Sequence, residues 1–233
     1  MMSWNKNRRN ITAISGAPGH QKDAPIGSYS NQFKTSDRWD PAIANVGGTW
    51  DKLLEQGIPL WGAIASSDYH NAKIDYPPCG FARIHVIAPT KDYDGLLQSL
   101  KTGTFWAGHG NVIEQLQLSL EIDGAPSPVY SGESAILPKS QTFGLVTVKI
   151  ARSEIHKNSP LSVDIISNCS SGQSEVIDES YILTAQNETK VIMSLNLNEK
   201  NSNKCFVRAR VTKDTLEEEN LVAYTNPIMI RLN

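Results

Sequence analysis

The chain has 233 residues, of which 39% are hydrophobic and 20% are charged, and its formal net charge is −2. These proportions indicate a globular protein with a packed core and exclude an intrinsically disordered chain. A net charge so near zero gives no reason to expect nucleic acid as a partner. No apolar run approaches the length of a transmembrane helix, and no signal-peptide core follows the basic residues near the N-terminus. The sequence therefore predicts a cytoplasmic protein without a membrane segment.

Residues 1–112 contain both strand and helix patterns, as expected for an α/β fold. Short apolar runs that stop at Gly or Pro predict strands, and amphipathic runs that begin at Thr and end at Gly predict helices. The run at 59–66 is apolar on both faces, as is typical of a parallel strand covered by helices. We expect strands within 10–19, 59–66 and 82–89, a long polar loop at 20–48, and helices at 49–57 and 90–103 with Thr49 and Thr90 as N-caps.

Residues 113–233 have few helix signals and many alternating segments. Runs such as "QLQLSLEI", "LVTVKI" and "VRARV" place apolar side chains at every second position, so one face of each strand is buried. Short strands separated by turn signals predict an immunoglobulin-like β-sandwich, and we place a domain boundary between residues 112 and 113. The expected strands lie at 113–123, 143–152, 161–168, 180–186, 190–198, 205–213 and 226–233.

The three cysteines, Cys79, Cys169 and Cys205, are an odd number at wide spacing. That pattern argues against a disulfide framework and against a cysteine zinc site. We therefore predict isolated thiols that pack as small apolar side chains.

The stretch "GAIASSDYHN" carries the clearest candidate site. Asp68 and His70 follow a predicted parallel strand, and ligands bind at that end of the strands in α/β folds. Side chains at positions i and i+2 of an extended segment point the same way, so the carboxylate and the imidazole can converge on one ion. This donor pair suits zinc, manganese or iron. The alternative is an ordinary strand that runs into a polar loop.

A family resemblance adds to this interpretation. In chain order, "WDKLLEQGIPLWGAIASSDYHN", "FARIHVIAPT" and "DGLLQSLKTGTFWAGHGN" resemble the C-terminal part of PHP-family proteins, the polymerase-and-histidinol-phosphatase family of metal-dependent hydrolases. The likeness covers residues 45–112, and the segment ending in "AYTNPIMI" looks like the accessory β-domain of the phosphoesterase-like branch. The resemblance implies the C-terminal portion of a distorted (β/α)7 barrel followed by the sandwich. It also implies that Asp68 and His70 bind a divalent metal and take part in hydrolysing a small phosphorylated substrate.

The chain departs from the family pattern at one important point. The family's opening strand carries a His-x-His motif, and this sequence contains none. Two ligands do not make a closed catalytic site, which has at least three protein ligands. We therefore expect a fragment of a longer frame, one chain of a split enzyme, or a degenerate descendant. A partner chain or self-association would complete the barrel, because a partial barrel exposes strand edges and apolar faces.

Three further residues are candidates for the same site. His20 follows a strand and a glycine turn, so it is either a metal ligand or substrate contact, or an ordinary loop histidine. His109 lies between two glycines, which allow a close approach of the backbone to a bound substrate. Arg83 is suited to bind a phosphate oxygen, or it forms a salt bridge near the start of its strand. His85, by alternation, is predicted to be a core or helix-facing histidine.

These observations lead to a metal-dependent hydrolase of the phosphoesterase type, incomplete or inactive on its own. The alternative is a non-catalytic binding protein, in which the half-barrel is a relic and the β-sandwich makes the contacts. The missing His-x-His motif is the main support for this alternative.

Overall fold

The computed structural model describes residues 13–18, 39–67, 69–169, 177–184, 189–197, 203–213 and 221–233. The structure is mostly β-sheet, with 46% strand and 14% helix. The predicted fold class is therefore wrong, because a (β/α)7 barrel needs parallel strands with a helix between each pair. Strands β3 (Ala82–Val86) and β4 (Phe105–His109) are joined through a helix, yet they pair antiparallel, with Ile84 opposite Ala107.

The described residues form three α-helices, α1 (Pro41–Ala44), α2 (Thr49–Glu55) and α3 (Tyr93–Thr102). Both predicted helices are confirmed, but their N-caps are not the predicted threonines. Gly48 precedes α2, and the Asp92 carboxylate caps α3 by accepting the Gly95 N–H at 2.8 Å. Gly103 ends α3 in the left-handed conformation, with φ 78°. No helix in the described ranges is long and apolar enough to cross a membrane.

Eight strands form the larger sheet. Its order is β10-β9-β12-β13-β4-β3, and β14 pairs with both β12 and β7. The β14–β7 pair is parallel, and the other pairs of this sheet are antiparallel. The strands not yet given are β7 (Ser134–Leu137), β9 (Leu161–Ser167), β10 (Ile177–Leu183), β12 (Lys204–Lys213), β13 (Leu221–Thr225) and β14 (Ile228–Leu232).

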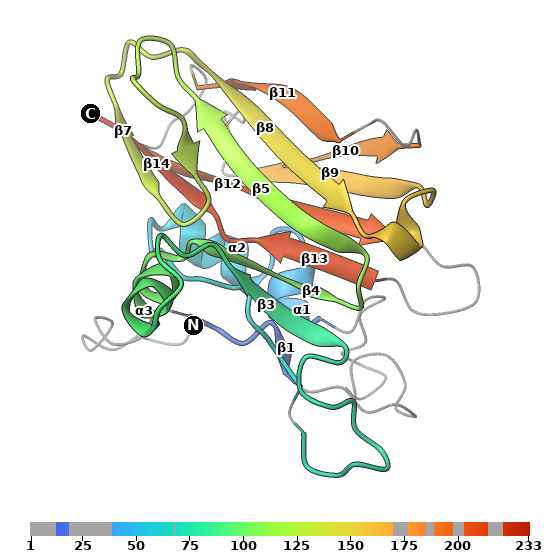
Figure 1. Cartoon of the computed structure of the whole chain (residues 1–233). Coiled ribbons are helices and arrows are strands. Elements are labelled where there is room, and N and C mark those ends of the chain that lie inside the picture. Colours follow the sequence, from blue (N-terminus) through green and yellow to red (C-terminus); the bar gives the residue numbers. More distant parts are fainter. Residues whose placement is uncertain are drawn as a thin grey trace.

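A second, four-stranded sheet packs over the larger one. Its order is β11-β8-β5-β6, all antiparallel (Figure 1). The inward side chains of both sheets form one apolar core, so the alternation predicted for the second half is confirmed as a two-sheet sandwich. A 3-10 helix, Glu154–His156, connects β8 to β9. The strands of this sheet are β5 (Ile113–Glu121), β6 (Val129–Tyr130), β8 (Phe143–Arg152) and β11 (Lys190–Asn196).

The larger sheet continues across the predicted domain boundary at residue 112. Strand β4 pairs with β13, and Gly108 lies opposite Ala223. A second apolar core covers the opposite face of this sheet and includes Trp39, Trp50 and Tyr224, all fully buried. The larger sheet is therefore buried on both faces, with the four-stranded sheet on one side and α1 and α2 on the other (Figure 1).

A buried ion pair joins α2 to β12. Arg208 donates from Nε and Nη2 to the two carboxylate oxygens of Asp51, at 2.7 and 2.8 Å, and both side chains are 0% exposed. The guanidinium also lies over the Trp50 ring, 4.6 Å from its centroid. Two parallel hydrogen bonds are the geometry that best offsets the desolvation of buried charges, while the third nitrogen, Nη1, is buried without a hydrogen-bond partner among the described residues. This contact fixes the helices on the sheet.

The disulfide Cys169–Cys205 corrects the prediction of isolated thiols. Ser167 of β9 lies opposite Val207 of β12 in an antiparallel pair, so two residues further along Cys169 comes opposite Cys205. The Cα–Cα distance is 5.1 Å, within the usual range for a disulfide. Cys79 is a free thiol, but it is exposed rather than packed in the core.

Candidate functional site

Two short parallel strands form the base of the candidate site. In strands β1 (Ala17–Pro18) and β2 (Ala65–Ser66), Ala17 lies opposite Ala65 and Pro18 opposite Ser66. The Gly16 N–H donates to the Ile64 carbonyl at 2.8 Å just before the pair begins. Of the strands predicted at 10–19 and 59–66, two residues each are paired in a regular strand, and residues 10–12 and 19 lie outside the described residues.

The predicted metal ligands follow the ends of these two strands. His20 and Asp68 lie outside the described residues. His70 is described, and its side chain is exposed. Of the ligand set Asp68, His70 and His20, only the His70 side chain therefore has a described position.

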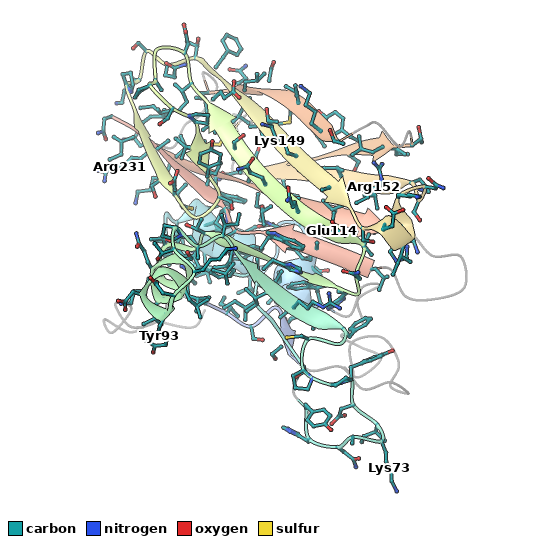
Figure 2. The ribbon with its side chains drawn as sticks, in the orientation of Figure 1. Lys73, Tyr93, Glu114, Lys149, Arg152 and Arg231 are labelled. Atoms are coloured by element: carbon teal, nitrogen blue, oxygen red, sulfur yellow. A yellow bond between two sulfur atoms is a disulfide. The ribbon has the colours of Figure 1, made fainter. Side chains whose placement is uncertain are left out.

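A buried carboxylate holds the backbone at His70. Asp75, only 3% exposed, accepts the His70 N–H at 2.8 Å and the Asn71 N–H at 2.6 Å. The Asp75 N–H in turn donates to the Asn71 carbonyl at 2.9 Å. Bonds from N–H groups to a carboxylate are strong, so this turn has a fixed shape. Figure 2 shows Lys73 at the tip of the same loop, away from both sheets.

Asp75 was not among the predicted site residues. An acidic residue near a turn usually lies in solvent, and the sequence alone does not show that this one folds back on residues 70 and 71. The available signal is its spacing, four residues after Asn71 and directly before the aromatic and proline run "YPP".

His109 lies in the core rather than on an open rim. It is 3% exposed, and its ring stacks against Trp39 at 5.2 Å and against Phe81 at 4.9 Å between centroids. The stack continues through Phe81 to Tyr76 at 4.8 Å, and Trp39 meets Tyr224 edge-on at 4.7 Å. This ring column, Tyr76–Phe81–His109–Trp39–Tyr224, connects the loop that carries His70 to the core. His109 therefore contacts the loop indirectly, through Phe81 and Tyr76.

Arg83 is half-buried near the start of β3. Its Nε donates to the Cys79 carbonyl at 2.7 Å, and its Nη1 donates to the Asn111 side-chain oxygen at 3.3 Å. No carboxylate of the described residues forms an ion pair with it. Arg83 therefore ties together the two segments that flank β3 and β4, and the salt-bridge alternative has no partner in the described part of the chain.

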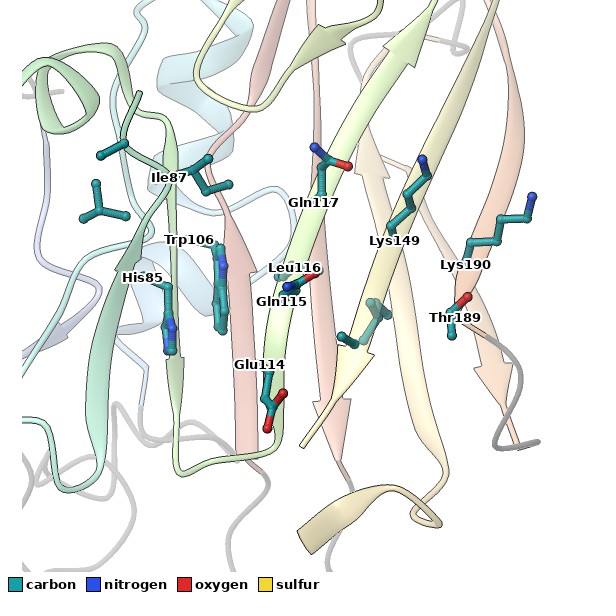
Figure 3. Close-up of a pocket in the computed structure, with 14 residues that line it drawn as sticks. His85, Ile87, Trp106, Glu114, Gln115, Leu116, Gln117, Lys149, Thr189 and Lys190 are labelled. Atoms are coloured by element: carbon teal, nitrogen blue, oxygen red, sulfur yellow. The ribbon is translucent and has the colours of Figure 1, made fainter. Parts of the chain in front are cut away.

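A cleft of about 700 Å³ lies where β3 and β4 meet the four-stranded sheet (Figure 3). On one side, the His85 ring lies flat on Trp106, with 3.7 Å between centroids and 2° between planes. Burial, and secondly the charge of Arg83, lower the pKa of His85 below its ordinary value of 6.5. The imidazole is therefore neutral at pH 7. The predicted core histidine is in fact half-buried and lines a cleft.

Within the part of the chain that the structure describes, no three His, Cys, Asp or Glu side chains lie close enough to hold a metal ion. No protein-family model matches the chain, and no curated protein matches its sequence.

Proposed function

We propose that this chain contributes to a divalent-metal-dependent hydrolase that cleaves phosphoesters. The observation that supports this best is the in-register parallel pairing of β1 and β2, with Pro18 opposite Ser66. Parallel strands in register end at the same edge, so the residues that follow them start close together. Because Pro18 and Ser66 come just before His20 and the Asp68–His70 pair, both candidate segments start from adjacent points.

The donor types fit a metal such as zinc, manganese or iron, because the candidates are one carboxylate and two imidazoles. A closed catalytic site takes at least three protein ligands, so the proposal needs His20 in addition to Asp68 and His70. Any further ligand would come from another residue of this chain, from a partner chain or from a second copy. When bound, such a metal lowers the pKa of a water ligand and neutralises charge on phosphate oxygens.

The chain's own residues would have distinct tasks. Asp75 fixes the backbone at His70 and so limits the directions in which the imidazole can point. Arg83 would turn its guanidinium to a phosphate oxygen of the substrate, a contact for which its planar donors are suited. His109 would act through packing, since it is buried in the ring column beneath the loop.

A non-catalytic binding protein is the second candidate function. The observation that favours it is the cleft beside His85, a space of about 700 Å³ whose lining does not include His70. A space of this size is within the range of small-molecule sites.

The test is the metal content of the purified chain, measured by elemental mass spectrometry, beside hydrolysis of a nitrophenyl phosphodiester with added zinc, manganese or iron. We expect near-stoichiometric metal in the wild type and its loss in a D68A/H70A variant. The matched control is H156A, which removes a histidine from the 3-10 helix of the sandwich. A metal-free wild type without hydrolysis, even after metal addition, would reject the proposal.

A further inference from the structure

The cleft beside His85 has two unlike sides. One is the His85–Trp106 stack on β3 and β4, and the other is a row of polar side chains on β5, β8 and β11 (Figure 3). Trp106 is 4% exposed and packs in the apolar core, so the histidine ring resting on it is held flat. One side of the cleft is therefore formed by two stacked rings that are held in a fixed orientation.

The row of polar side chains includes two lysines directly opposite one another. Strand register pairs Gln117 with Lys149, and Lys149 with Lys190, so the three side chains share one face of the sheet. Neighbouring strands are about 4.8 Å apart, so the row spans about 10 Å. Like charges directly opposite on neighbouring strands are destabilising.

Neither ammonium group is neutralised by the described part of the chain. Both lysines are exposed, and no carboxylate of the described residues lies within ion-pair distance of Lys149 or Lys190. The cleft's own carboxylate, Glu114, likewise has no cationic partner among those residues. The cleft thus has two cations, which attract an anion, and one carboxylate, which accepts hydrogen bonds from hydroxyl groups.

The position of Glu114 has a structural cause. Strand β5 shifts register between Ile113 and Gln115, where an extra residue enters the strand. Such bulges redirect a side chain and are common next to binding sites. Here the extra residue is Glu114, and both Glu114 and Gln115 line the cleft.

We propose that this cleft binds a sugar that carries an anionic group. The anion lies between Lys149 and Lys190, the hydroxyl groups donate to Glu114, and the sugar lies against the ring edges of the His85–Trp106 stack, because Trp106 stands between His85 and the row of polar side chains (Figure 3). Two sources share this chemistry, a uronic acid of an acidic oligosaccharide and a sugar phosphate. The proposal does not depend on the metal site, because none of the proposed metal ligands lines the cleft.

The test is calorimetric titration of the full chain with four probes, trigalacturonate, glucose 6-phosphate, neutral glucose and inorganic phosphate. We expect binding of one of the two anionic sugars and none of neutral glucose. Trigalacturonate alone would indicate an oligosaccharide, and glucose 6-phosphate alone would indicate a phosphorylated metabolite. Inorganic phosphate binding as tightly as either sugar would overturn the proposal, as would a chain that binds no probe at millimolar concentration.

Substitutions of the residues that line the cleft test whether the sugar binds there. K149Q and K190Q should each raise the Kd about fivefold and the double variant about twentyfold, the scale of exposed ion pairs. K139Q, at an exposed lysine outside the cleft, is the matched control and should change nothing. H85A should weaken binding about fivefold, whereas H85F keeps a flat ring over Trp106 and should bind nearly as the wild type. Unchanged binding in K149Q/K190Q would overturn the proposal.

Discussion

Reducing the Cys169–Cys205 disulfide should lower the stability of this protein by a calculable amount. The bond joins residues 36 positions apart in the sequence. In the chain-entropy treatment, closing a loop of this length removes about 13 cal/mol/K from the unfolded chain, which is about 3.8 kcal/mol at 25 °C. With an m-value of about 2.5 kcal/mol/M, the urea midpoint should fall by about 1.5 M on reduction.

The assay combines thiol labelling with urea titration. Under denaturing conditions, an alkylating reagent should add one label to the oxidised chain, at Cys79, and three labels after reduction. Urea titrations with and without reductant then measure the loss of stability, and a C169A/C205A variant should no longer respond to reductant. Cys79→Ser is the matched control, because it removes the exposed thiol and leaves the disulfide intact.

Either of two results would refute this reasoning. Three labels before reduction would mean that the bond does not form in the protein. A urea midpoint that does not move on reduction would mean that the loop is already constrained in the unfolded chain.

Three other changes give separate tests. Arg208→Met should destabilise the fold by about 3–5 kcal/mol in urea titrations, because it leaves the Asp51 carboxylate buried without its partner; a loss below 1 kcal/mol would contradict the buried bidentate geometry. The pKa of His85 is lowered, so the folded protein binds this proton less readily than the unfolded chain, and urea titrations should show stability falling as the pH drops from 6.5 toward the lowered pKa. Arg83→Gln removes the nearby positive charge, so it should raise the pKa of His85 in an NMR titration. An unchanged pKa would exclude the effect of the Arg83 charge. Asp75→Ala should speed amide exchange in the loop it caps while leaving exchange in the sheets unchanged, because two backbone N–H groups lose their acceptor.

The elements whose pattern is local could be predicted from the sequence. The strand expected at 143–152 matches β8, and the one at 161–168 differs from β9 by a single residue. The helix expected at 90–103 begins later because Asp92, rather than Thr90, supplies the cap. In each case alternation or periodicity over seven to ten residues outweighs other influences.

The barrel could not be excluded from the sequence, because strand pairing depends on partners far along the chain. Nothing within residues 82–109 shows that β4 will pair with a strand at 221–225, which lay in a gap between two expected strands. The alternation in "VRARV" suggested outward polar side chains, but Arg208 is fully buried because helices cover that face of the sheet. The disulfide likewise follows from the register of β9 and β12, which the spacing of the cysteines does not encode.

The surroundings of the predicted metal site also depend on contacts between residues that the sequence pattern does not encode. The motif "SSDYH" indicates donors of the right type after a strand, and the structure places β1 and β2 side by side at that point. The Asp75 carboxylate that fixes the loop and the ring column beneath it were not predicted. Both depend on contacts between loops and strands that have no periodic signature.

Strand β4 cannot pair with β13 until most of the chain has been synthesised. Gly108 meets Ala223 only after the ribosome has added a further 115 residues, which takes about 6 to 23 s at ordinary elongation rates. Until then, one edge of β4 has no neighbour, and the second apolar core lacks Tyr224. The nascent first half therefore exposes an open strand edge and uncovered aromatic rings for seconds, an interval in which a chaperone or a premature partner has access to them.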